Sequence, residues 1–129
     1  MAQVKIYGHK QHIAKNAALL SMAIHQAVME ALEYPPDKKF HRFIPLERRW
    51  FVYPDDRSEN YTIVEISMFE GRSVETKKTL IRLLINYISE QVNIETNDIE
   101  ITISESPRSN WGIRGVPADE LSLQYKVDM

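Results

Sequence analysis

The residues best suited to chemistry lie in the short run Phe69–Ser73, with the sequence Phe-Glu-Gly-Arg-Ser. Arg72 follows a run typical of a β-strand, and Ser73 precedes a helical pattern that begins at Val74. The first N–H groups of a helix have no partner within the helix, and this end is electropositive. A guanidinium beside such free donors is typical of a site that holds an anion. The sequence therefore predicts an anion-binding turn at Arg72.

Regular patterns on both sides of this turn predict the elements that position it. Tyr61–Met68 alternates as a strand, Val74–Val92 has an amphipathic helical period, and Asp98–Glu105 alternates again. Ser73 is a suitable N-cap for the helix, and Asn93 can close it in a left-handed conformation. The anion-binding turn is therefore expected at the first junction of a strand–helix–strand unit.

The first half of the chain shows the same order of elements. We predict a strand for Gln3–Tyr7, a polar connection for His9–His12 and a helix for Ile13–Leu32, which has one apolar face. The prolines of Tyr34–Asp37 end this helix, because proline cannot continue it. A second strand is predicted for Phe40–Ile44, and it is ended by Pro45, which follows directly.

The 129 residues correspond to a single domain built from two repeats. Repeat one is assigned to residues 1–46, a connector to 47–60, repeat two to 61–115 and a C-terminal tail to 116–129, in which Leu121–Val127 is a candidate strand. The expected fold class is α+β, with two β-α-β repeats forming a four-stranded mixed sheet and both helices on one face. The third strand is partly apolar on both faces, so the uncovered face is expected to pack against other subunits.

The composition excludes several classes of function. The chain is 43% hydrophobic and 26% charged with a net charge of −2, which argues against nucleic acid as a partner. The basic and aromatic segment 38–51 is assigned instead to a strand and the connector. The chain has no cysteine, which excludes disulfides and fits a cytoplasmic protein. No apolar run approaches the length of a membrane span, so no membrane partner is expected.

No metal or cofactor is expected from the sequence. His9 and His12 have a spacing that can ligate a metal, but no third ligand accompanies them. A solvated loop is the simpler interpretation of this pair.

Separated pieces of the second half together resemble one subunit of 4-oxalocrotonate tautomerase. They are Phe69–Arg82, Ile99–Glu105 and Asn110–Gly115, within a match of about 55 residues. The doubled length and the Pro-Pro-Asp of residues 35–37 resemble the malonate semialdehyde decarboxylase branch of the tautomerase superfamily. Those proteins are trimers of fused β-α-β units, similar to macrophage migration inhibitory factor. The resemblance therefore implies a homotrimer, which would cover the open face of the sheet.

The resemblance also implies roles for individual residues. In this family the amine of an N-terminal proline moves the proton, arginines hold the substrate carboxylate, and an aromatic side chain keeps the pocket apolar. Arg72 matches the carboxylate-binding arginine, Trp111 the pocket aromatic, and Asp37 the water-activating aspartate of the decarboxylase branch. Ala2 replaces the proline, so removal of Met1 would expose a primary amine that can act as a base or form an imine.

Other positions depart from the family pattern. The second arginine of the simple tautomerases is absent, because Glu100 stands there, whereas Arg114 adds a cation within the glycine-rich segment. Arg42 is a further candidate for the carboxylate. The resemblance implies an isomerase that tautomerises a small carboxylate-bearing oxo acid. Two alternatives stay open: a malonate semialdehyde decarboxylase-like lyase or hydratase, and a catalytically silent trimeric homologue with a binding or structural role.

Overall fold

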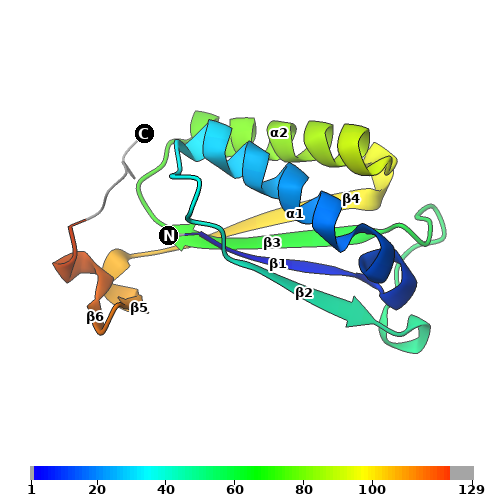
Figure 1. The fold of residues 1–129 in the computed structure, drawn as a ribbon, viewed down its shortest axis with the longest axis horizontal. Coiled ribbons are helices and arrows are strands. Elements are labelled where there is room, and N and C mark those ends of the chain that lie inside the picture. Colours follow the sequence, from blue (N-terminus) through cyan, green and yellow to red (C-terminus); the bar gives the residue numbers. More distant parts are fainter. Residues whose placement is uncertain (1, 123–129) are drawn as a thin grey trace.

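A computed structural model describes residues 2–122, in which two helices lie on one face of a four-stranded sheet (Figure 1). The helices and strands are β1 (Ala2–His9), α1 (Lys10–Leu32), β2 (His41–Leu46), β3 (Thr62–Phe69), α2 (Val74–Val92), β4 (Ile99–Ser106), β5 (Gly112–Ile113) and β6 (Val116–Pro117). Short 3-10 helices occupy Arg48–Trp50, Thr96–Asp98, Arg108–Asn110 and Ala118–Glu120. The predicted α+β class is confirmed.

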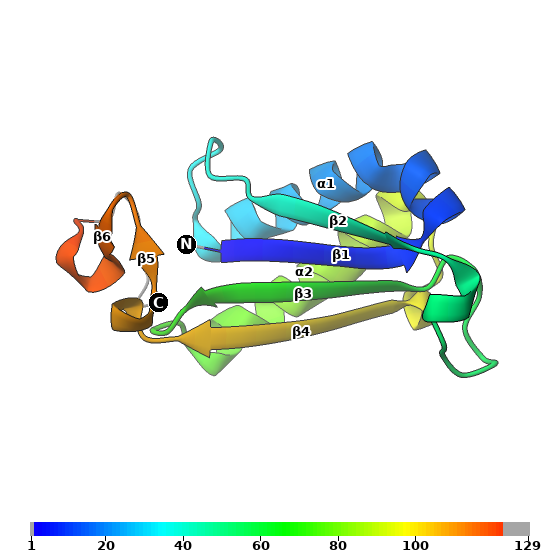
Figure 2. The same ribbon diagram turned by 90° about the horizontal axis from the view of Figure 1, so that it is seen from below.

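The sheet has the order β2-β1-β3-β4, and it is mixed (Figure 2). Strand β1 runs parallel to β2, and β3 runs parallel to β4, whereas the two central strands are antiparallel. Strands β5 and β6 form a separate hairpin beyond the end of the main sheet. Each helix therefore connects two parallel strands, as a β-α-β unit requires.

The two repeats correspond position by position with an offset of 60 residues. Strands β1 and β3 both have eight residues, with the same succession of buried and half-buried side chains. Both helices end at equivalent positions, and the residues that follow them, Glu33 and Asn93, both adopt a left-handed conformation. Apart from the helix starts, at Lys10 and Val74, a residue in repeat one therefore has its structural counterpart 60 positions later.

The main core lies between the helices and the sheet. Apolar side chains from the two central strands pack against one stripe of each helix, and burial of this surface is the main force that assembles the two layers. The most deeply buried of them are Val4, Ile6, Leu20, Ile24, Val64, Ile66, Leu80, Leu84 and Ile88.

The predicted polar connection at His9–His12 is wrong, because β1 continues directly into α1. His9 is the last residue of the strand, and His12 lies in the first turn of the helix. Both imidazoles are buried, and hydrogen bonds to Tyr53 and Thr62 make this burial tolerable. Gly8 makes the sharp passage possible, since a Cβ atom there would lie 2.9 Å from Cδ2 of His12.

The predicted end of the second strand at Pro45 is also wrong, because β2 extends to Leu46. Strand β2 is at the edge of the sheet, where a residue without an N–H group costs no ladder hydrogen bond. The candidate strand Leu121–Val127 lies largely outside the described residues.

The sheet face opposite the helices is mostly polar. On β3 this face carries Ile63, Glu65 and Ser67, which alternate with the fully buried residues. Tyr7 of β1 donates a hydrogen bond of 2.6 Å to Oε1 of Glu65, and this contact raises the pKa of the Tyr7 hydroxyl. The expectation of a partly apolar face therefore holds for Ile63 but not for its neighbours. The hydrophobic effect alone does not require another subunit to cover this face of the sheet.

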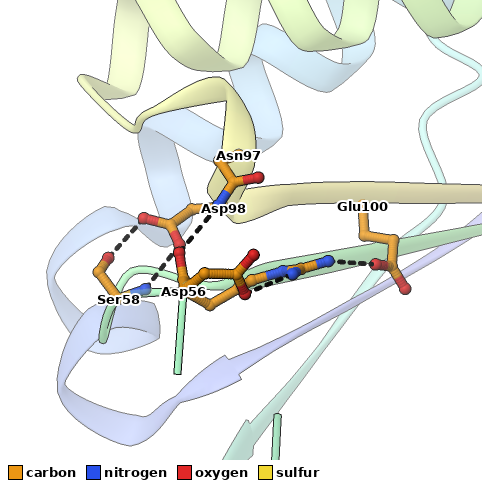
Figure 3. A network of polar contacts seen from close by, with 6 residues as sticks. Asp56, Ser58, Asn97, Asp98 and Glu100 are labelled. Carbon is orange, nitrogen blue, oxygen red and sulfur yellow. Dashed lines mark hydrogen bonds and ion pairs between the residues drawn. The ribbon is translucent and has the colours of Figure 1, made fainter. Parts of the chain in front are cut away.

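A network of polar contacts fixes the connector to the start of β4 (Figure 3). The buried carboxylate of Asp98 accepts hydrogen bonds from the backbone N–H of Ser58, at 2.8 Å, and from its hydroxyl. Asn97 donates to the carbonyl of Asp56, and Arg57 pairs with Asp56 and Glu100. These contacts determine where the chain enters β3.

Neither helix of the described chain has the length and apolar character to cross a membrane.

Candidate active site

Arg72 is a buried arginine at the junction of β3 and α2. Its side chain is 5% exposed, Nη1 donates to the carbonyl of Phe69 at 3.4 Å, and the guanidinium carbon lies 5.7 Å from the ring centre of Tyr34. Its Nε and Nη2 atoms are buried without a hydrogen-bond partner among the described residues. Buried polar groups are almost always satisfied, so these two N–H groups indicate that an acceptor belongs here. Gly71, at φ 128°, permits the turn.

The backbone around Arg72 forms as the sequence predicts. Helix α2 spans Val74–Val92, and the hydroxyl of Ser73 accepts a hydrogen bond of 3.1 Å from the backbone N–H of Thr76. This N-cap fixes the start of the helix, and with it the position of Arg72.

The start of β1 lies at the same end of the sheet as Arg72. Ala2 is buried and pairs with Met68, the penultimate residue of β3 (Figure 2). Tyr34, beside the Arg72 guanidinium, belongs to the loop that follows α1. The structure thus brings the beginning of repeat one and the helix start of repeat two together.

Asp37 lies in this same loop, and its side chain is exposed to solvent. The loop turns at a hydrogen bond of 3.1 Å from the backbone N–H of Lys38 to the carbonyl of Pro35. Asp37 therefore follows Tyr34, which lies beside Arg72, by three residues in the sequence. Its side chain is not buried at the Arg72 site.

Trp111 and Arg114 come from the segment after β4. The Trp111 ring meets the ring of Phe69 edge to face, with the centroids 5.0 Å apart, and the carbonyl of Phe69 is the partner of Arg72. Arg114 is exposed in the turn between β5 and β6, with φ 53°. Trp111 thus reaches the site through Phe69, whereas Arg114 lies on the hairpin surface.

Arg42 does not join the Arg72 site. It pairs with Lys5 across β1 and β2, on the sheet face away from the helices, and its Nη2 donates to Gln3 at 3.3 Å. Tyr34, against which Arg72 lies, belongs to the core on the helix side. The sheet therefore separates the two arginines.

Two histidines that the sequence did not predict as site residues lie beside the loop that carries Asp37. Nε2 of His25 hydrogen-bonds the carbonyl of Pro36 at 2.8 Å, and Nδ1 of His41 contacts the hydroxyl of Ser21 at 2.7 Å. Burial, helped by His25 and by a nearby lysine, lowers the pKa of His41 to about 4. A histidine in an apolar helical stripe shortly before a Pro-Pro pair is the signal that could have indicated this support.

A profile of the tautomerase enzyme family matches residues 38–114. The chain belongs to this family. The 2-hydroxymuconate tautomerase of Comamonas testosteroni is 40% identical over 57 residues, which are 44% of this chain and 90% of that protein. A probable tautomerase of Bacillus subtilis (strain 168) is 24% identical over 97 residues, which are 71% of this chain and 76% of the relative. The resemblance found in the sequence is confirmed.

Solved structures share the fold of this chain. Native fused 4-OT has a TM-score of 0.83 at 17% identity and covers 92% of this chain and 98% of its own. A symmetric trimer of fused 4-OT has a TM-score of 0.77 at 18% identity, and the match covers 91% of this chain and 96% of that one. A malonate semialdehyde decarboxylase has a TM-score of 0.78 at 17% identity and covers 86% and 89%.

Proposed function

We propose that this tautomerase is an isomerase that interconverts the keto and enol forms of a small oxo acid, with Arg72 binding the carboxylate. The observation that carries the proposal is the pair of buried, unsatisfied N–H groups of Arg72 among the described residues. Nε and Nη2 lie on one edge of the guanidinium, and this edge matches the two oxygens of a carboxylate. A neutral ligand would leave the buried positive charge without compensation.

The proton-transfer step in this proposal uses the amine of Ala2 after removal of Met1. An α-amine with its ordinary pKa of about 7.7–8.0 is partly neutral at pH 7 and can therefore act as a base. It takes the proton from the enol hydroxyl and returns a proton to carbon, so the reaction needs no cofactor and no net proton change. Trp111 and Phe69 would keep water away from this step.

We extend the homotrimer of fused 4-OT to this chain as part of the same proposal, since the two share the fold over nearly their whole length. Arg42 and Arg114 are candidates for the substrate only across such an assembly, because neither joins Arg72 within one chain. The cytoplasmic location expected from the composition belongs to the same proposal.

A malonate semialdehyde decarboxylase-like lyase or hydratase is the second candidate function. It is supported by the position of Asp37, in a loop that is fixed near Arg72 by the bond from His25 to Pro36. In that reaction Asp37 would activate water.

The test measures the rate of 2-hydroxymuconate ketonisation by the wild type and by Arg72→Ala. The control is Arg82→Ala, since Arg82 is an exposed residue of α2. We expect Arg72→Ala to lower kcat/KM by about a hundredfold, because a buried charge-assisted contact is lost, whereas Arg82→Ala stays near the wild type. Circular dichroism checks that each variant is folded. Equal rates for the wild type and Arg72→Ala would remove Arg72 from the mechanism. No turnover of 2-hydroxymuconate or malonate semialdehyde by the wild type would favour the silent homologue.

A further inference from the structure

A pocket at the opposite end of the sheet from Arg72 forms a second candidate site. Its volume is about 940 Å³, within the range of sites for small organic ligands. The first turns of α1, the 3-10 helix after β2, the end of α2 and the chain before β3 form its walls. The Asp98 network fixes the last of these walls (Figure 3).

This pocket is the counterpart, in repeat one, of the Arg72 site. With the offset of 60 residues, Thr62 corresponds to Ala2 at the start of a strand, and His12 corresponds to Arg72. His12 lies in the first turn of α1, whereas Arg72 comes just before α2. His12 and Arg72 are buried to the same degree, at 6% and 5% exposure. The end of α2 borders this pocket as the loop after α1 borders Arg72. The repeat therefore relates the surroundings of His12 to those of Arg72.

The polar groups around His12 differ from those around Arg72. Nε2 of His12 lies 2.7 Å from the hydroxyl of Thr62, and Nδ1 lies 2.9 Å from the side-chain nitrogen of Asn16. Burial, with a contribution from His9, lowers the pKa of His12, so this imidazole is neutral at pH 7. Thr62 lies within the chain and has no α-amine. The pocket therefore lacks both the buried cation and the base of the first site.

Two features at the start of α1 place hydrogen-bond donors beside this pocket. Helix α1 begins here without a side-chain cap and without an acidic residue in its first turn. His9, which lines the pocket, is 8% exposed, and its Nδ1 is buried without a partner among residues 2–122. When Nε2 of His9 accepts from the hydroxyl of Tyr53, at 2.6 Å, Nδ1 carries a proton that it can donate. A helix start and an unsatisfied imidazole N–H together favour an anion.

The charged side chains of the pocket favour the same ligand. Two carboxylates face four cations, and both carboxylates are already paired, Glu47 with Lys10 and Arg49 and Glu59 with Arg48. Lys15 is the fourth cation, and it has no ion pair within the described chain. The remaining wall is apolar and is made of Leu19, Leu46, Val92 and Ile94.

We propose that this pocket is a second ligand site, which binds a small organic carboxylate with an apolar body and does not convert it. The cationic rim and the helix start would contact the carboxylate, and the apolar wall would contact the body. This inference does not depend on the proposed isomerase activity, because no residue of the second pocket takes part in it.

The test is a titration of the full chain with 2-naphthoate, followed by the backbone amide signals in ¹⁵N NMR spectra. We expect saturable shifts at Gln11 and His12 with a Kd of about 1 mM or tighter. Lys15→Glu should weaken this binding by about fivefold, since it reverses a charge on the rim, while the exposed control Lys78→Glu changes it less than about twofold.

The Arg72→Ala variant separates the two sites. Shifts at Gln11 and His12 should be the same in this variant as in the wild type, whatever its effect on turnover. Shifts confined to the Gly71–Val74 amides, or equal binding by Lys15→Glu and Lys78→Glu, would overturn the second site. Loss of turnover in Arg72→Ala with unchanged shifts at His12 would support both proposals.

Discussion

Arg72 differs from an ordinary helix-entry arginine in how it is buried. Arginines at helix starts usually keep the guanidinium in water, because exposure costs nothing there. Here the guanidinium is buried against Tyr34 with one long contact to Phe69. Its two unsatisfied N–H groups among the described residues are a local cost that a bound carboxylate would remove. The arrangement therefore supports anion binding more directly than it supports any particular reaction.

Ala2→Pro tests the amine at the scale of a single residue. We expect the substitution to raise kcat for ketonisation by about tenfold, because a proline amine is the base on which the family's chemistry rests. Ala2 begins β1, and a proline is tolerated at the first position of a strand. Intact-mass measurement must first show that Met1 is absent from both proteins. An unchanged rate in protein that lacks Met1 would count against the amine as the base.

Local signals predicted some site residues but not others. Arg72, Ser73 and Asn93 follow from the pattern of one strand and one helix, and the capping roles of Ser73 and Asn93 are observed. The burial of His12 could not be predicted, since its partner Thr62 is 50 residues away. The position of Arg42 was missed for a related reason: alternation shows that a strand has two faces but not which one the helices cover.

The connector is the element whose position depends on one buried carboxylate. Asp98→Ala should lower the free energy of unfolding by about 2 kcal/mol, because the backbone N–H and the hydroxyl of Ser58 both lose their charged acceptor. Urea denaturation measures this change, and exposed Asp119→Ala is the control, for which no loss is expected. Equal midpoints for the two variants would mean that water replaces the contact.

The residues that end the two helices form a matched pair for a second test. Glu33 and Asn93 are equivalent and left-handed, with φ 53° and 60°, but asparagine tolerates this conformation better than glutamate does. We expect Glu33→Gly to raise the free energy of unfolding by about 0.5–1 kcal/mol, and Asn93→Gly to raise it less. Thermal unfolding of both variants checks the order. The reverse order would show that Glu33 has a stabilising contact of its own.

The two helices also show when boundaries can be predicted. The bounds of α2 agree with the prediction because a serine cap and a left-handed asparagine mark its ends. Helix α1 begins three residues earlier than predicted, since it follows β1 without a cap and starts with polar side chains. Two of the polar residues that suggested a loop, His9 and His12, are buried by contacts with distant parts of the chain.

Stability of the whole molecule should depend on pH through the half-buried His41 and the buried His12. The pKa of His41 is lowered to about 4, mainly by burial, whereas in the unfolded chain it is about 6.5. The unfolded state therefore binds the proton first as the pH falls, and stability is lost between about pH 6.5 and pH 4. We expect this one group to account for about 2 kcal/mol over that range. The lowered pKa of His12 acts in the same direction.

His41→Asn is the variant that isolates this effect, since asparagine can retain the contact with Ser21. Chemical denaturation of the wild type and the variant at several pH values should show a shallower loss of stability for His41→Asn. Parallel curves would assign the acid sensitivity to other groups.

The fold of the whole chain was predictable because both halves repeat one pattern of periods. Alternating and helical segments recur at a constant spacing, so the β-α-β units and the mixed sheet follow from sequence alone. The polar character of the uncovered sheet face was not predictable in the same way. It depends on cross-strand neighbours such as Tyr7 and Glu65, which are far apart in the chain.

The offset of 60 residues has a consequence for how a duplicated chain can work. A polypeptide has one amino terminus, but this fold has two equivalent strand starts, at Ala2 and Thr62. When two units are joined in one chain, a backbone amide replaces the free amine at the second start. Joining thus halves the number of possible amine bases while leaving two strand–helix junctions. The junction without an amine is then free of the demands of catalysis, and the helix start at Lys10 differs from the one at Val74.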